Sequence, residues 1–167
     1  MNRWKLNKLI FLSIPFSSNI RKPMKLALIG GGNMGGALLK ALVKSNTLAA
    51  SDTLLIEPDS GKRENLVRET GCRAKASIDD EIAGADCLLL AVKPQSATNV
   101  MPTLKPLLTG NPMLISVMAG VSMQSLEEGL GLKKLVRVMP NTPALVGEGM
   151  SVYLSLIHIS EPTRRSY

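Results

Sequence analysis

Three glycines near the start of the chain have the types and spacing needed to bind a phosphate. Gly30, Gly32 and Gly35 match the G-x-G-x-x-G turn of dinucleotide folds. Gly30 would permit a tight turn, Gly32 would let the backbone approach a pyrophosphate, and Gly35 would let a helix pack closely on a strand. Amides at the start of that helix would face the phosphates, where the helix dipole favours negative charge. The same spacing also occurs in flexible turns, so the flanking residues decide.

Those flanking residues favour the nucleotide interpretation. Residues 25–29 predict a short buried strand before the turn. After the turn, one apolar helical face is predicted from Met34, Ala37, Leu38, Ala41 and Leu42. Strand, turn and helix therefore follow one another in the order that the motif demands.

An acidic residue follows a second apolar strand, predicted over residues 53–56. Glu57 stands about 20 positions beyond the glycine turn, where dinucleotide folds hold the adenosine ribose. Lys62 and Arg63 then offer cations for a 2′-phosphate, although both also suit the solvated first turn of a helix over residues 61–70. The choice between NAD and NADP stays open.

Strands and helices alternate along the rest of the chain. Further strands are predicted over residues 73–76, 86–92, 113–117 and 134–138, with a weak helix over 78–83, a helix ending near 108 and one capped by Ser122. This alternation predicts an α/β fold with a doubly wound, mostly parallel sheet of the Rossmann type. Lys93, Gly120, Asn141 and Thr142 follow predicted strands, so a cleft is expected at that edge.

Composition argues against several other classes of protein. The net charge is +7, but residues 1–23 hold five basic and no acidic residues, while residues 24–154 hold thirteen basic and twelve acidic ones. A nearly neutral body with no basic stripe argues against nucleic-acid binding. We predict no metal site and no membrane segment. Cys72 and Cys87 are expected to be reduced packing residues of a cytoplasmic protein, and His158 is given no role.

The two ends of the chain are expected to lie outside the domain. Residues 1–23 are basic and superficially resemble a signal peptide, yet no cleavage site follows their interrupted apolar run. They are interpreted as a transit peptide or as translation from a start codon upstream of Met24. The domain is expected over residues 24–154, and residues 155–167 are interpreted as a tail that does not belong to it.

Four stretches carry a resemblance to one enzyme family: residues 30–35, 91–94, 115–122 and 137–144. With these in the same order, residues 24–154 resemble the N-terminal domain of pyrroline-5-carboxylate reductase. The first stretch is shared with many dehydrogenases, whereas Met-Pro-Asn-Thr-Pro-Ala at residues 139–144 is specific.

The resemblance implies NADPH- or NADH-dependent reduction of 1-pyrroline-5-carboxylate to L-proline. The implied cofactor contacts are Ile29, Gly30, Gly31, Gly32, Asn33, Met34 and Gly35 in the turn and Ala91, Val92, Lys93, Pro94, Met118, Ala119 and Gly120 along the path to the nicotinamide. Asn141 and Thr142 would lie nearest the substrate, although Asn-Thr-Pro also suits a simple turn.

The family's helical domain, which would form the homo-oligomer and complete the substrate site, is not recognised in this sequence. The chain alone is therefore expected to be inactive. Two alternatives stay open: a catalytically silent dinucleotide-binding module, and a related reductase acting on another small substrate.

Overall fold

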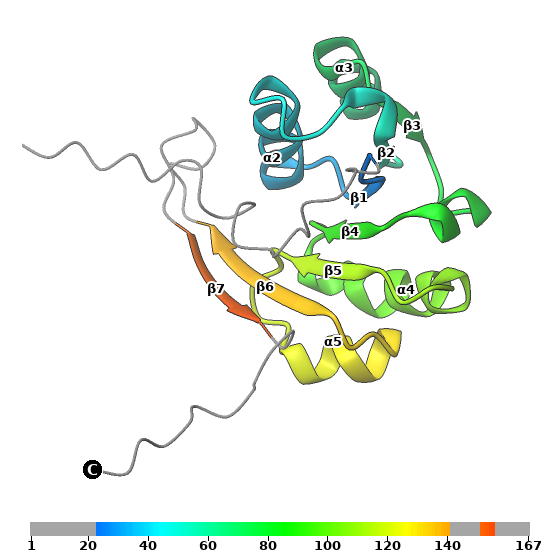
Figure 1. The fold of residues 1–167 in the computed structure, drawn as a ribbon, viewed down its shortest axis with the longest axis vertical. Helices are drawn as coiled ribbons and strands as arrows, with labels where there is room; N and C mark the ends of the chain where they lie inside the picture. Colours follow the sequence, from blue (N-terminus) through cyan, green and yellow to red (C-terminus); the bar gives the residue numbers. More distant parts are fainter. Residues whose placement is uncertain (1–22, 141–150, 156–167) are drawn as a thin grey trace, which may run out of the picture.

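The computed structural model describes residues 23–140 and 151–155 of the chain, and it is built around one seven-stranded sheet. The strands lie in the order β3-β2-β1-β4-β5-β6-β7. Strands β1 to β6 are parallel, and β7 pairs with β6 in the antiparallel direction (Figure 1). The bounds are β1 Leu26–Ile29, β2 Thr53–Ile56, β3 Arg73–Lys75, β4 Cys87–Leu90, β5 Met113–Ser116, β6 Leu135–Pro140 and β7 Ser151–Ser155.

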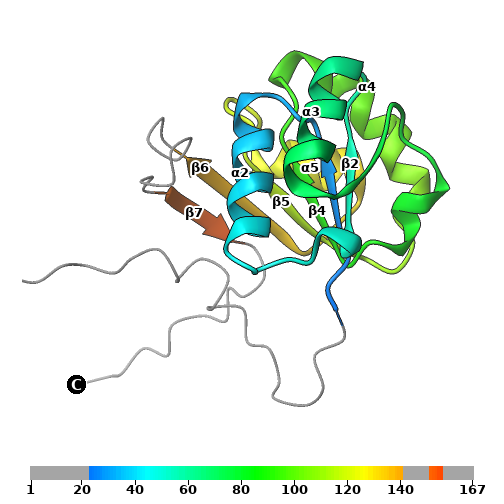
Figure 2. The same cartoon turned by 90° about the horizontal axis from the view of Figure 1, so that it is seen from above.

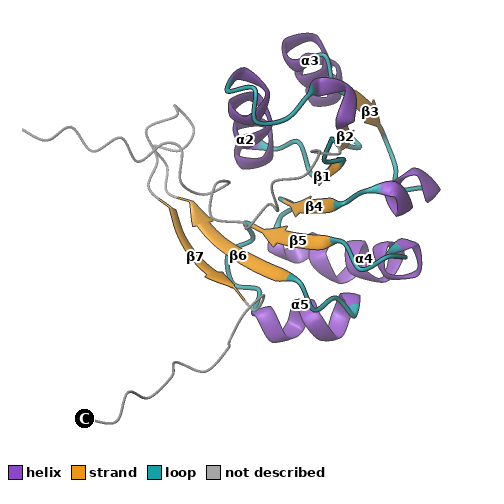
Figure 3. Ribbon diagram, viewed as in Figure 1, coloured by secondary structure: helices purple, strands orange, loops and turns teal. Residues whose placement is uncertain are grey.

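Helices cover both faces of this sheet (Figures 1 and 3). Helices α2 and α3 pack together on one face, and α4 and α5 pack together on the other. The α-helices are α2 Asn33–Lys44, α3 Ser60–Thr70, α4 Pro94–Leu104 and α5 Met123–Leu130; the short 3-10 helices are η1 Ala50–Asp52, η2 Asp80–Gly84 and η3 Lys105–Leu107. The predicted doubly wound, mostly parallel α/β fold is confirmed.

Apart from Thr53, the central strands β1, β2 and β4 carry apolar side chains on both faces, and helices cover both faces. Every residue of β1, β2 and β4 is buried, as expected for parallel strands between two helical layers. Alternate side chains feed two cores. Ile29 and Leu90 lie in the core beneath α4 and α5, whereas Leu28 and Leu89 lie in the core beneath α2 and α3.

The predicted apolar face of α2 is correct in part, since Leu38 and Leu42 pack against the core beneath α2 and α3. Leu39 is fully buried and Gly35 and Gly36 face the protein, while Ala41 is exposed. At Gly35 the helix lies close to Gly30 and Ala91, and at Gly36 it lies close to Leu66. A prediction from the spacing of large apolar residues does not detect contacts made by glycine. Hydrophobic periodicity therefore found the helix and part of its inner face, but missed the buried residues Gly35, Gly36 and Leu39.

Several element boundaries also differ from prediction. The apolar run over residues 86–92 contributes only β4, because the chain turns away after Leu90. The helix expected to end near residue 108 ends at Leu104 and continues as η3, and the weak helix over residues 78–83 is the 3-10 helix η2. Strand β7 was not predicted. Figure 2 shows it alongside β6. The cap on α5 is confirmed, since Ser122 Oγ accepts from Ser125 N–H at 3.0 Å.

Both cysteines are buried and free, as predicted for packing residues. Each is 2% exposed, and burial raises the pKa of the Cys87 thiol to about 12. Within the described ranges, no helix is long and apolar enough to cross a membrane, and no group of three or more potential metal ligands gathers.

A network of ion pairs ties β3 to η2. Arg73 pairs with Glu81, and Lys75 pairs with both Asp79 and Glu81. Hydrogen bonds from Lys75 are the leading cause that holds the pKa values of the Asp79 and Glu81 carboxyls below their usual range. These side chains fix the outer strand to the segment that crosses over to β4.

Candidate dinucleotide-binding site

The turns that follow β1 and β4 meet at the carboxyl edge of the sheet. Strand order reverses between these two strands, which is the topological switch point where open α/β sheets bind ligands. Ala91 N–H donates to the Ile29 carbonyl at 2.9 Å, and Gly30 N–H donates to the Ile56 carbonyl at 2.9 Å. Backbone hydrogen bonds therefore hold three predicted site segments side by side: the glycine turn and the ends of β2 and β4.

The glycine turn needs its first and third glycines for internal reasons. Gly30 has φ +101°, and a Cβ there would lie 2.8 Å from the Ala91 carbonyl oxygen. A Cβ on Gly35 would overlap the Gly30 carbonyl oxygen and lie 3.0 Å from the Ala91 methyl. The tight turn and the close helix packing predicted for these two positions are both present.

The second glycine is different, because the space around it is open. Gly32 is the N-cap of α2 with extended backbone angles, and no atom lies within 4 Å of a Cβ built on it. It has no side chain to accept from the first-turn amides, and that turn holds no acidic residue. A helix N-terminus with open space and no internal cap fits an anionic phosphate group.

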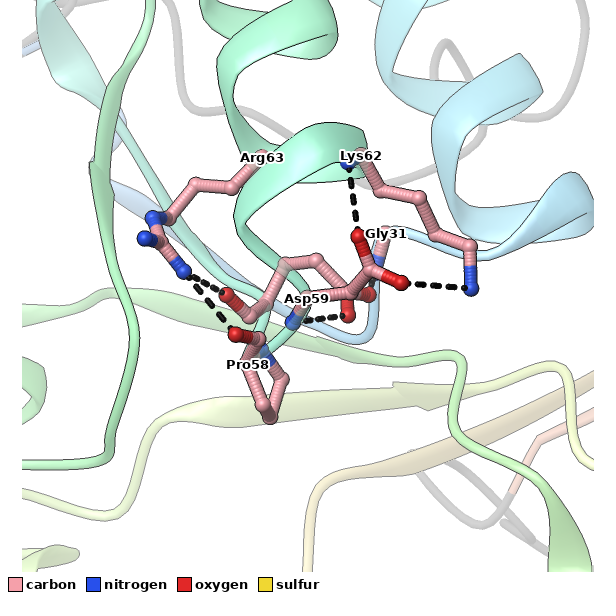
Figure 4. Close-up of polar contacts among 6 residues, drawn as sticks. Gly31, Pro58, Asp59, Lys62 and Arg63 are labelled. Carbon is pink, nitrogen blue, oxygen red and sulfur yellow. Dashed lines mark hydrogen bonds and ion pairs between the residues drawn. The ribbon is translucent and has the colours of Figure 1, made fainter.

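The end of β2 is packed with polar contacts (Figure 4). Glu57 is 8% exposed and accepts from Gly31 N–H at 2.7 Å and from Asp59 N–H at 3.0 Å. Arg63 donates from one guanidinium nitrogen to the carbonyls of Glu57 at 2.8 Å and Pro58 at 3.1 Å. In the turn between β2 and α3, the Glu57 side chain thus binds a backbone N–H group, and the Arg63 side chain binds two backbone carbonyls.

Asp59 caps α3 and pairs with Lys62, one of the two cations that the sequence offers for a 2′-phosphate. Its carboxylate accepts from Lys62 N–H at 3.0 Å and lies 3.5 Å from Lys62 Nζ. The hydrogen bond from the Lys62 backbone is the main cause of a lowered pKa at the Asp59 carboxyl. The sequence interpretation missed this role, although an aspartate just before a helix is a recognised N-cap signal.

The remaining predicted cofactor residues lie in the turns after β4 and β5. Lys93 and Pro94 are exposed, with Lys93 the N-cap of α4 and Pro94 its first residue. Met118 is 2% exposed, while Ala119 and Gly120 face solvent.

Two contacts tie the turn after β5 to this edge. Val117 N–H donates to the Leu90 carbonyl at 3.1 Å, and the buried Ser116 hydroxyl accepts from Met118 N–H at 3.4 Å. Sequence reasoning gave Ser116 no supporting role, although a hydroxyl at the end of an otherwise apolar strand is a detectable signal. The predicted substrate-proximal pair, Asn141 and Thr142, lies outside the described residues.

A family of reductases matches this part of the chain. The family model described as "NADP oxidoreductase coenzyme F420-dependent" matches residues 25–120. The chain belongs to this family of NADP oxidoreductases. Its matched range contains the glycine turn and the predicted cofactor residues up to Gly120.

The resemblance to pyrroline-5-carboxylate reductases is also confirmed. The enzyme of that name from Synechocystis is 36% identical over 128 residues, which are 77% of this chain and 48% of the relative. A solved pyrroline-5-carboxylate reductase from Coxiella burnetii has a TM-score of 0.75 and 27% identity, covering 80% of this chain and 50% of that one.

A second solved relative contains a cofactor. The Plasmodium falciparum pyrroline carboxylate reductase with NADP bound has a TM-score of 0.67 and 33% identity, over 84% of this chain and 50% of its own. This chain thus spans about half the length of the relatives it matches.

Proposed function

We propose that this NADP oxidoreductase domain binds NADPH or NADH at the carboxyl edge of its sheet and serves the reduction of 1-pyrroline-5-carboxylate to L-proline. The uncapped N-terminus of α2, beside an open Gly32 at the switch point, carries the proposal. The names of the relatives supply the substrate.

The cofactor would follow the line of turns along this edge. Ile29, Gly30, Gly31, Gly32, Asn33, Met34 and Gly35 would hold the pyrophosphate. The turn Ala91, Val92, Lys93 and Pro94 and the turn Met118, Ala119 and Gly120 would lie on the way to the nicotinamide. Glu57 would lie at the ribose end of this line.

The reaction suits an edge made largely of backbone and apolar groups. A reduced nicotinamide supplies hydride to the C=N carbon of the ring, and the ring nitrogen gains a proton as the imine becomes an amine. Because the imine is already polarised, the protein's contribution is orientation and exclusion of water. We assign the positions nearest the substrate to Asn141 and Thr142, on the strength of the family motif.

A hybrid enzyme tests the proposal directly. Residues 24–154 would replace the matching segment of the Synechocystis pyrroline-5-carboxylate reductase, and formation of L-proline would be followed with NADPH and NADH. We expect turnover with the hybrid and none with its Gly32→Val form. Cofactor binding without proline formation would favour the second candidate, a silent dinucleotide-binding module. Turnover only with another small imine or hydroxy acid would identify a related reductase.

The same proposal includes the partners and the location. We propose that a protein in which this domain is joined to the family's helical domain forms a homo-oligomer. We expect it to bind no nucleic acid. The two buried free thiols, Cys72 and Cys87, support a reducing compartment such as the cytoplasm. Sedimentation of the hybrid tests the oligomer, because a monomeric active hybrid would contradict it.

A further inference from the structure

We propose that Glu57 is a positioning residue that braces the glycine turn against the β2–α3 turn, rather than a ligand of the adenosine ribose. The brace is a property of the protein itself. Its effect on cofactor affinity rests on the function proposed above.

Both carboxylate oxygens of Glu57 are used within the protein. Oε2 accepts from Gly31 N–H at 2.7 Å, and Oε1 accepts from Asp59 N–H at 3.0 Å. One side chain thus joins two turns that lie 26 residues apart in the sequence. Hydrogen bonds from amides to a carboxylate are stronger than neutral ones, so this link fixes both turns before any ligand arrives.

The surroundings hold the carboxylate in this position. A Cβ on Gly31 would lie 3.2 Å from Glu57 Oε2 and 2.8 Å from the Leu66 Cδ1 atom, so the turn fits closely between β2 and α3. On the other side, Arg63 binds the carbonyls of Glu57 and Pro58 (Figure 4). The Glu57 carboxylate binds the Asp59 amide, and Arg63 binds the carbonyls just before it. The β2–α3 turn therefore has little freedom to move away from the sheet.

A ribose ligand would need an acceptor oxygen that faces solvent, and Glu57 does not supply one. Its side chain is buried, with 8% exposure for the whole residue. An acid at this position normally distinguishes NAD from NADP by contacting the ribose 2′-hydroxyl. With both oxygens directed at amides, Glu57 should affect the two cofactors equally.

Hydrogen exchange of the 167-residue chain without cofactor tests the brace. We compare the wild type with Glu57→Ala, Glu57→Gln and the control Glu64→Gln, which changes an exposed glutamate of α3. Loss of a hydrogen bond to a charged group predicts about tenfold faster exchange or more at the Gly31 and Asp59 amides in Glu57→Ala. Glu57→Gln keeps one acceptor oxygen and should restore protection at one of the two amides. Unchanged protection of both amides in Glu57→Gln, the variant that best preserves the fold, overturns the proposal.

A cofactor series separates bracing from ribose binding. NADH, NADPH and NADH lacking the adenosine 2′-hydroxyl are titrated against the wild type and Glu57→Gln. A brace predicts that all three lose affinity by the same factor, within about twofold, because the protein and ligand changes are then independent. A loss for NADH that disappears with the 2′-deoxy form would overturn the brace and restore the ribose role. If the wild type binds none of the three, the proposed function fails, while the exchange experiment still decides the brace.

Discussion

Helices α2 and α3 begin at the same edge of the sheet, on the same face, but their first turns are treated in opposite ways. The first turn of α3 is closed internally, with Asp59 accepting from Lys62 N–H and Arg63 fastening the preceding carbonyls. At α2, the N-cap is Gly32, which contributes no side chain and has open space around it. The function proposed above accounts for this difference, because an anionic phosphate would bind the amides that no side chain of α2 caps.

The largest expected effect comes from removing the close packing that sets the angle of α2. Gly35→Ala places a methyl group onto the Gly30 carbonyl oxygen, which is backbone and cannot rotate away. We expect a loss of about 3 kcal/mol or more in the free energy of unfolding. Urea melts of this variant and of Gly84→Ala, where a Cβ meets no atom within 4 Å, provide the matched comparison. Equal midpoints would show that the helix tolerates a wider spacing.

Gly32→Val tests whether the open N-terminus of α2 serves a ligand. The new side chain meets no protein atom within 4 Å of its Cβ, so stability should be nearly unchanged. Affinity for NADPH should fall by about tenfold or more, because the valine side chain keeps the pyrophosphate away from the backbone. Fluorescence titration of the variant beside Gly84→Val measures this. Undiminished affinity would remove the glycine turn from the site.

Converting α2 to the capped state of α3 would sharpen the comparison. In Gly32→Asp the new carboxylate can accept from the first-turn amides, which should add a few tenths of a kcal/mol to stability. Cofactor affinity should fall at the same time, because the carboxylate occupies the amides and repels phosphate. Gly32→Asn supplies the cap without the charge and is the control. The two quantities, thermal midpoint and dissociation constant, are expected to move in opposite directions, and a parallel change would contradict the interpretation.

The smallest expected effect concerns the titration of the α3 cap. Because the folded protein lowers the pKa of the Asp59 carboxyl, its stabilising contribution is present above the usual pKa, near 3.8, and is lost as the pH falls through the lowered value. Asp59→Asn retains an acceptor but does not titrate in this range. The advantage of the wild type over Asp59→Asn in thermal midpoint at pH 7 should therefore shrink at pH 3. A constant difference across this range would mean that the charge contributes nothing to the cap.

The sequence was informative wherever local physics decides the structure. Gly30 correctly predicted a tight turn, and Gly35 correctly predicted a close packing contact. Runs of apolar residues correctly predicted the covered strands β1, β2 and β4. Prediction failed where long-range geometry decides. Leu39 is buried on the inner face of α2 while Ala41 is exposed. Strand β7 pairs with β6, although the Asn-Thr-Pro turn signal that follows β6 in the sequence was not interpreted as part of a hairpin.

The same limit applies to the candidate site. The position of Glu57 at the end of β2 could be predicted from the sequence, and so could its place at the carboxyl edge of the sheet, but its hydrogen-bond partners could not. The amides that Glu57 binds belong to Gly31 and Asp59, and only the folded chain brings the first of these within 2.7 Å of its Oε2 atom. Residue type and spacing thus located the edge of the sheet, whereas the use of each polar group depended on tertiary structure.

The ion pairs on β3 bear on how the sheet avoids aggregation. In the described part of the chain the sheet ends at β3 on one side and at β7 on the other. A foreign strand adding to β3 would gain at most the length of Arg73–Lys75 in pairing, and it would meet two cations held in place by Asp79 and Glu81. Short, charged edge strands are a known protection against edge-to-edge association. The length and charge of β3 therefore disfavour growth of the sheet by strand addition on this side.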